Sequence, residues 1–218
     1  MSLDFNFILR NLPLFGKGLL VTVELSLLAI FFAMIWGLVV ALARMAENRA
    51  LRTVAAGYIE LVRDTPVLVQ MYFIYFGFSM GGFGLSGFVS GLLALSLQNG
   101  GYIAEIYRAG IESISVRQIE GGKALGMSRW DVMTIVILPQ ALVRVIPPLA
   151  NQFIVIIKDT SLVSAIAVVE LTQIGKLLTE RTAASYEVFL TIAVLYLALT
   201  GFVSGLSRIA ERRLAIYH

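Results

Sequence analysis

The sequence has no cysteine, and its only histidine is His218. Without cysteine there is no disulfide framework, no thiolate metal site and no cysteine nucleophile. A lone histidine at the end of the sequence also excludes imidazole chemistry inside the fold. Charge is scarce too, because charged residues make up 14% of the 218 residues, where about 25% is usual. The chain must therefore work without the usual catalytic side chains.

Hydrophobic residues are in excess, at 58% of the chain, against roughly 45–50% in a soluble globular protein. The mean hydropathy is +0.86. A small soluble domain of this composition could not cover its surface with polar groups. The composition therefore indicates a polytopic membrane protein, and it argues against a disordered chain, a soluble enzyme and a nucleic-acid partner.

Five stretches reach the length of about 20 apolar residues that a helix needs to cross a bilayer. They predict an all-α fold, a single domain over 1–218, with transmembrane helices at about 19–43, 58–79, 85–110, 131–157 and 187–208. Lys and Arg concentrate in the loops after the first and third spans and after the fifth. This bias predicts that the N-terminus lies outside and the C-terminus in the cytoplasm.

Two stretches differ from simple spans. Pro139, Pro147 and Pro148 interrupt the fourth span, which should therefore be kinked and packed within protein, with Arg144 bonded to a carbonyl that Pro147 or Pro148 frees. Between the last two spans, the part at 162–178 is moderately apolar but contains charges. Its length of about 17 residues predicts a helix that caps the outer face, not a sixth span.

The loop at 114–130, on the predicted cytoplasmic face, is of mixed polarity. Gly126 is placed to end a short helix in the left-handed conformation, and Ser128 to cap the next helix together with Asp131. Two short helices with a bend between them predict a compact knob that can enter a groove of a partner. Four residues are expected near one face of the first helix: Ile119, Gly122, Leu125 and Gly126.

The same loop resembles the signature of ABC-importer permeases, which is Glu-Ala-Ala, three residues, Gly, nine residues and Ile-x-Leu-Pro. Gly121 and Gly122 stand where the family prefers alanine, and Val136 replaces Ile. Each change to glycine should cost roughly 1 kcal/mol of helix propensity. The residues that match the required intervals are Glu120, Gly126, Leu138 and Pro139.

Three other runs resemble the polar amino acid uptake branch of that family, at 63–70, 99–111 and 158–162. In the first run the family usually has glycine where Asp64 stands. The resemblance extends from about Gly16 to Arg213, and four ordered motifs together are specific where any one would be weak. The chain is thus identified as a member of the MetI-like type I ABC-importer permeases, with the fold of that family.

The resemblance implies a set of partners. Family members pair two permease subunits, identical or homologous, with two cytoplasmic ABC ATPase subunits, and an external binding protein delivers the amino acid substrate. The sequence contains no GxxxxGK[ST] motif, so ATP and magnesium should be used by the partner subunit. The chain is accordingly expected to be no enzyme by itself, to bind no cofactor or metal, and to reside in the lipid of the bacterial cytoplasmic membrane. The residues expected to couple it to the ATPase are Glu120, Gly121, Gly122, Ala124, Leu125, Gly126, Ser128 and Arg129.

Polar groups at membrane depth are candidates for a solute pathway, because they are costly there unless they are paired or lie in a wet cavity. Carboxylates can hold the ammonium group of a zwitterion, and basic or amide groups its carboxylate. The alternative is structural: amides can tie helices together, and charged ends can reach the interface. The predicted substrate-binding residues are Gln70, Gln98, Asn99, Lys158 and Asp159.

Two alternative functions are an intramembrane serine protease and a channel or passive scaffold. The run at 84–87 matches the GxSG of intramembrane serine proteases, but that chemistry needs a base near the serine, and the only histidine is His218. A channel or passive scaffold would use the intramembrane polar residues as pore lining. It would not explain the predicted cytoplasmic knob.

Overall fold

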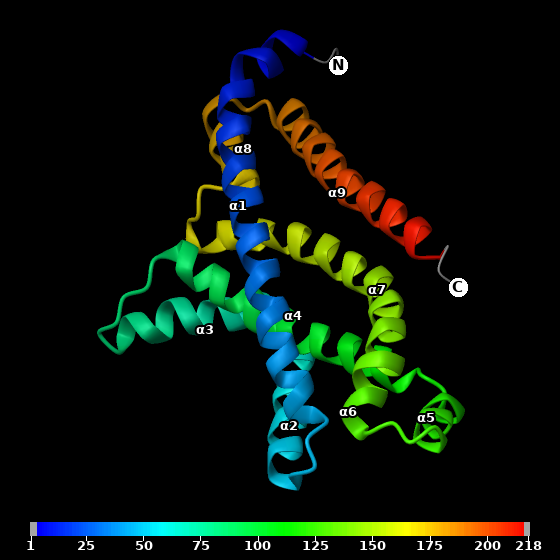
Figure 1. Cartoon of the computed structure of the whole chain (residues 1–218). Helices are drawn as coiled ribbons and strands as arrows, with labels where there is room; N and C mark the ends of the chain where they lie inside the picture. Colours follow the sequence, from blue (N-terminus) through cyan, green and yellow to red (C-terminus); the bar gives the residue numbers. More distant parts are fainter. Residues whose placement is uncertain (1–3, 216–218) are drawn as a thin grey trace.

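The computed structural model describes residues 4–215, so His218 and the other residues at 1–3 and 216–218 lie outside the described part. All regular structure within residues 4–215 is helical. Two long helices, α1 (Phe5–Arg44) and α4 (Gly87–Glu112), cross in the middle of the molecule, and the others pack around them (Figure 1). The predicted all-α fold is confirmed.

Helix α1 begins well before the apolar run at 19–43 that marks the predicted span. Asp4 caps the helix, because its side chain accepts the N–H of Phe7 at 3.1 Å. The helix then continues through Pro13 up to Arg44. It is therefore longer than the apolar segment that hydropathy detects.

Glycines allow α1 and α4 to approach closely. A Cβ atom on Gly37 would lie 2.7 Å from the side chain of Ile103, and one on Gly100 would lie 2.6 Å from Trp36. Small residues at helix contacts are the usual means of close packing in membranes. Around this crossing lies the main core, which includes Leu25, Ala29, Ala33, Ala94, Leu95 and Ile103.

The predicted span at 58–79 consists of two helices, α2 (Arg49–Asp64) and α3 (Val67–Met80). Pro66 lacks an N–H group and disfavours the helical conformation in the residue before it. Thr65 is accordingly extended, with φ −113° and ψ 138°. The break thus has a cause in the sequence.

After α4 the chain forms α5 (Val116–Ala124), α6 (Arg129–Asp131), a π-helix at Val132–Ile137 and α7 (Leu138–Asp159). The ribbon bends between α6 and α7 (Figure 1). Helix α7 runs on through Pro147 and Pro148, so the irregular turn lies before Pro139. Arg144 donates to the carbonyl of Ser113 at 2.5 Å. The prediction that it bonds a carbonyl freed by Pro147 or Pro148 is therefore wrong.

The segment at 162–178, predicted as one capping helix and not as a sixth span, consists of parts of two helices, so its predicted continuity is wrong. A 3₁₀-helix at Thr160–Ile166 ends at Ala167, which is left-handed with φ 60°. Glu170 then begins α8 (Leu171–Thr182) by accepting the N–H groups of two residues in its first turn. The carboxylate therefore starts a new helix where apolarity alone indicated continuity. The last helix, α9, spans Ser185–Ala215.

Within the described residues, three helical stretches are long and apolar enough to cross a membrane: Phe5–Arg44, Arg129–Ile166 and Ser185–Arg213. The α2–α3 pair and α4 occupy the other two predicted spans, and both carry more polar residues. Helices α5 and α6 lie away from the end of the molecule that holds the start of α1 and α8 (Figure 1). The number of spans and the orientation stay predictions.

Candidate functional site

The knob formed by residues 115–131 is built around Gly126. This residue has φ +80°, which glycine adopts without the steric cost that a Cβ atom brings. The N–H of Met127 donates to the carbonyl of Gly122 at 3.1 Å, and that of Gly126 to Lys123 at 2.9 Å. This pair of bonds is the Schellman motif, so the predicted end of the first helix is confirmed.

The predicted cap of the second helix is confirmed as well. The N–H of Asp131 donates to Oγ of Ser128 at 3.2 Å. In return the carboxylate of Asp131 accepts the N–H of Ser128 at 3.1 Å. This reciprocal capping box fixes the path of the chain immediately after the bend.

The knob is held by an apolar cluster on one side and by an exposed ion pair, in which Nη1 of Arg129 lies 3.5 Å from Oε1 of Glu47 between α1 and α2. Ile119 and Met127 pack with Val132, Val136 and the end of α4 in a small apolar cluster. Gly122 is buried, and a Cβ on it would lie 3.2 Å from the side chain of Val132. Leu125 and Gly126 were also expected on this face, but both are exposed, Leu125 to 84%.

The opposite side of the knob is open. Of the eight residues predicted to couple to the ATPase, Gly122 is buried and the other seven are exposed. Trp130 is 73% exposed and was not in the predicted set, although a tryptophan in a polar loop is a sequence signal. Exposed large apolar side chains on a projecting element are typical of a surface that a partner covers.

Gln70 serves the break between α2 and α3. Its Nε2 donates to Oγ1 of Thr65 at 2.7 Å and to the carbonyl of Val62 at 3.1 Å. Both of these groups lie where Pro66 interrupts the helical bonding. Gln70 also faces a groove of about 470 Å³ between α2, α3 and α4, and Tyr58 and Phe73 line the same groove.

Asn99 joins α4 to α7. It is buried, its Nδ2 donates to the carbonyl of Leu95 at 2.8 Å, and its Oδ1 accepts Nε2 of Gln152 at 2.6 Å. Sequence reasoning missed Gln152, although it is an amide within a predicted span. The neighbouring Gln98 has a buried Oε1 with no hydrogen-bond partner among the described residues.

The two charged candidates lie at the end of α7. The side chain of Lys158 is exposed and that of Asp159 is partly buried. Among the described residues, no side-chain hydrogen bond joins any two of the five predicted substrate-binding residues. The structure therefore does not assemble them into one hydrogen-bonded site.

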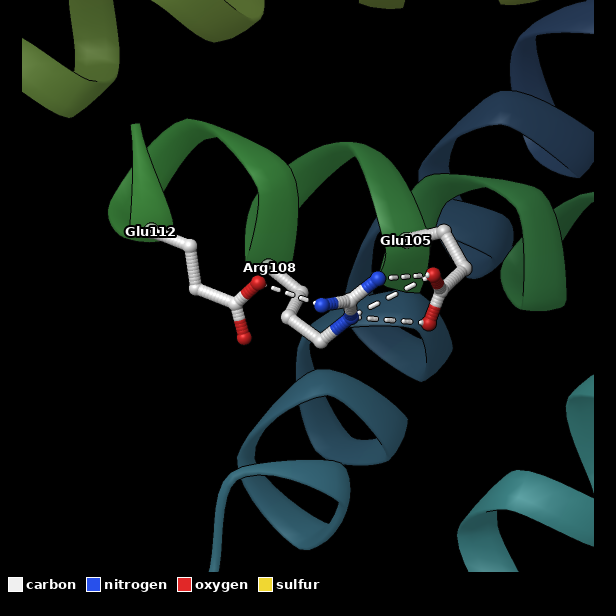
Figure 2. Close-up of polar contacts among 3 residues, drawn as sticks. All are labelled: Glu105, Arg108 and Glu112. Atoms are coloured by element: carbon white, nitrogen blue, oxygen red, sulfur yellow. Dashed lines mark hydrogen bonds and ion pairs between the residues drawn. The ribbon is translucent and has the colours of Figure 1, made fainter. Parts of the chain in front are cut away.

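A charged ladder on α4 was also missed by sequence reasoning. Arg108 donates to Glu105, with Nη2 at 2.6 Å from Oε2, and also to Glu112, one turn further along (Figure 2). Such pairs, three and four residues apart, are neighbours on a helix surface. Glu105 also lines a small hollow with Arg63, whose guanidinium lies 5.4 Å from the ring centre of Tyr102.

Ser86 of the GxSG sequence caps α4. Its Oγ accepts the N–H of Val89 at 3.3 Å. The serine is thus used as a helix cap.

The helical arrangement and the projecting knob are those of a permease, and comparisons with known proteins agree. The chain belongs to the family described as binding-protein-dependent transport system inner membrane component, whose profile matches residues 29–216. The glutamine transport system permease protein GlnP of Escherichia coli K12 is 38% identical over 218 residues, covering 99% of this chain and 100% of that protein. The L-cystine transport system permease protein TcyB of Bacillus subtilis 168 is 39% identical over 206 residues, covering 94% of this chain and 88% of TcyB.

A solved structure described as an amino acid ABC transporter with histidines has a TM-score of 0.93 and 37% identity, and the match covers 98% of this chain and 100% of that one. The inward-facing MetNI methionine ABC transporter has a TM-score of 0.78 at 19% identity, and the match covers 94% of this chain and 98% of that one. The second likeness concerns the fold alone. The chain therefore has the type I ABC importer permease fold, as the signature in the loop predicted, and it is similar to amino acid transporter permeases.

Proposed function

We propose that the chain is the membrane permease subunit of an ATP-driven importer that takes up polar or charged amino acids delivered by an external binding protein. The observation that carries this proposal is the knob, which presents Leu125 and Trp130 to the outside on a chain of the permease family. The names of the relatives, permeases for glutamine, cystine and nopaline, support an amino acid as solute. The membrane is the bacterial cytoplasmic membrane.

The energy comes from a partner, since the chain carries no phosphate-binding loop of its own. ABC ATPase subunits bind the knob and use ATP and magnesium. A second permease subunit, identical or homologous, completes the pathway. Closure of the ATPases moves the knob, and rigid-body movement of the helices then opens the pathway to one side or the other.

Within the pathway we assign the solute site to the five predicted residues, which have different roles in it. Gln98 offers a buried oxygen without a partner, and Asp159 offers a carboxylate at the end of α7. Gln70 and Asn99 already make hydrogen bonds that hold helices together. Their role is therefore to shape the site, and that of Lys158 is to attract the solute carboxylate.

The test is uptake in proteoliposomes that contain this chain, a matching ATPase, the second permease subunit and a binding protein. Uptake of a labelled polar amino acid should require ATP and the binding protein. Uptake without ATP would instead support the channel alternative and contradict the proposal.

The assignment of Asp159 has its own test in the same assay. Asp159→Asn removes the charge that pairs with the ammonium group and should raise the solute concentration at half-maximal uptake by roughly ten- to a hundredfold, since an ion-paired hydrogen bond is worth about 1.5–3 kcal/mol. Glu180→Gln, at an exposed position of α8, is the control. Unchanged uptake kinetics in Asp159→Asn would mean that the carboxylate only reaches the interface.

A further inference from the structure

The π-helix at Val132–Ile137 is the one connection between the knob and α7, and its origin can be read from the sequence. In a regular α-helix the ring of a proline collides with the carbonyl four residues before it, and its missing N–H leaves that carbonyl unbonded. Pro139 stands just after this segment. The turn before it is wound more widely, because the N–H of Leu138 donates to Met133, five residues back. Pro139 thus accounts for the wide turn.

The wide turn is short of main-chain donors. The shift to bonds that reach five residues back, together with the proline, leaves more carbonyls than N–H groups at the start of α7. Gln140 supplies one of the missing donors, since its Nε2 donates to the carbonyl of Val136 at 2.7 Å. A buried or partly buried carbonyl without a donor is costly, so this side chain stabilises the turn in its wide form.

The π-turn is attached to the knob at its start and to α4, through α7, at its end. On the knob side, Val132 and Val136 pack against Gly122 and Ile119. On the membrane side, Arg144 of α7 donates to Ser113 at the end of α4. A displacement of the knob relative to α7 therefore acts on the turn that Gln140 closes. π-Turns within helices are frequent at functional positions.

We infer that Gln140 is a positioning residue for energy coupling: by closing the π-turn at Val136 it keeps the knob and α7 as one lever, so that movement of the knob becomes movement of α7. The inference rests on the proposed function, because it assumes that a partner moves the knob. Without the bond, movement of the knob is absorbed by local rearrangement of the turn, and ATP is hydrolysed with less transport.

The experiment measures solute taken up per ATP hydrolysed in the reconstituted complex. Gln140→Met keeps the length of the side chain and removes the donor. It should lower this ratio by roughly fivefold, the factor that corresponds to one hydrogen bond of ordinary strength. The ratio does not depend on how much complex folds, so a purely structural role would leave it unchanged.

Asn11→Leu provides a matched control, since Asn11 also donates its side-chain amide to a carbonyl four residues back, that of Phe7 at 2.9 Å, but near the start of α1. Its ratio should equal that of the wild type. A Pro139→Ala background supplies a double-mutant cycle, because alanine restores a main-chain donor to the turn. The effect of Gln140→Met should be smaller in that background.

Two results would overturn the inference: an unchanged ratio in Gln140→Met, or an equal effect of that substitution with proline and with alanine at position 139. Amide exchange of the segment 132–138 in the complex gives a second readout, and it should be faster in Gln140→Met than in the wild type. A wild-type complex that hydrolyses ATP without uptake would contradict the proposed function itself. Wild-type uptake with an unchanged variant ratio would contradict only the role of Gln140.

Discussion

Glu170 is fully buried, which a carboxylate seldom is unless it is paired or hydrogen-bonded. Its oxygens accept the N–H groups of Thr172 and Gln173, each at 2.8 Å, and the hydroxyl of Tyr196 at 3.0 Å. Thr22 of α1 lies within 3.4 Å of the same carboxylate. One side chain thus connects α8 to α1 and α9, three elements that are distant in the sequence.

Replacing this carboxylate should therefore destabilise the outer part of the molecule. Glu170→Leu removes the acceptor of two N–H groups and of the hydroxyls of Tyr196 and Thr22, and a buried donor left unpaired costs about 1–3 kcal/mol. Glu170→Gln keeps one acceptor oxygen and should lose less. Thermal unfolding of the purified chain in detergent measures this, with the exposed Glu180→Gln as control. The same unfolding temperature for Glu170→Leu and the control would contradict this view of the contact.

The same residue predicts a dependence of stability on pH. Burial raises the pKa of Glu170 above its ordinary value of 4.5, although the N–H groups of Thr172 and Gln173 act in the opposite direction. A carboxyl whose pKa is raised by folding holds its proton more tightly in the folded state. Its contribution to stability is therefore complete below pH 4.5 and is lost as pH rises through the raised pKa.

Unfolding temperatures measured at increasing pH should therefore fall more steeply for the wild type than for Glu170→Gln, which does not titrate. Parallel curves for the two proteins would show that another group causes the dependence.

Among the elements, α5 and α6 show what a sequence can predict. The bend at Gly126 and the capping box of Ser128 were predictable, because each depends on neighbouring residues with fixed local geometry. The exposed position of Leu125 was not, because it depends on which side of α5 packs against Val132 and Val136. The bond between Asn99 and Gln152 was also beyond reach, since it depends on how α4 and α7 pack.

A pair of glycines in this element separates backbone strain from packing. A Cβ atom meets nothing within 4 Å at Gly121 or at Gly126, but only Gly126 has a positive φ. Gly126→Ala should destabilise the bend by roughly 1–2 kcal/mol, whereas Gly121→Ala should stabilise α5 by about 1 kcal/mol.

Amide exchange across 116–131 measures both changes, and co-purification of the ATPase shows their effect on the partner. Exchange should be faster in Gly126→Ala and slower in Gly121→Ala than in the wild type. Equal exchange in the two variants would mean that the left-handed residue does not hold the bend.

For the whole molecule, hydropathy indicated the long apolar helices well and the other predicted spans less well. Helices α1 and α9 appear as clean runs, because lipid-facing sides require apolar residues. In the α2–α3 pair, α2 carries exposed charged residues and α3 is apolar but short. Helix α4 contains the buried amide of Asn99, which lowers its hydropathy. Sequence motifs, not hydropathy, therefore identified the family correctly.

The predicted orientation can be tested with single cysteines, since the chain has none of its own. Ala50→Cys at the start of α2 and Glu180→Cys on α8 are both at exposed positions. A membrane-impermeant maleimide added to intact spheroplasts should label the cysteine at 180. The cysteine at 50 should react only after permeabilisation, and the reverse pattern would contradict the orientation.

The glycine contact between α1 and α4 limits which movements the molecule can make. A Cβ atom would lie only 2.7 Å from its nearest neighbour at Gly37 and 2.6 Å at Gly100. The two helices therefore have no space to slide past one another. Interfaces packed in this way tend to move as rigid bodies. The crossing of α1 and α4 is then a fixed frame. Opening toward either side of the membrane requires other elements to move against this frame, namely α3 beyond the break at Thr65–Pro66 and α7 together with the knob.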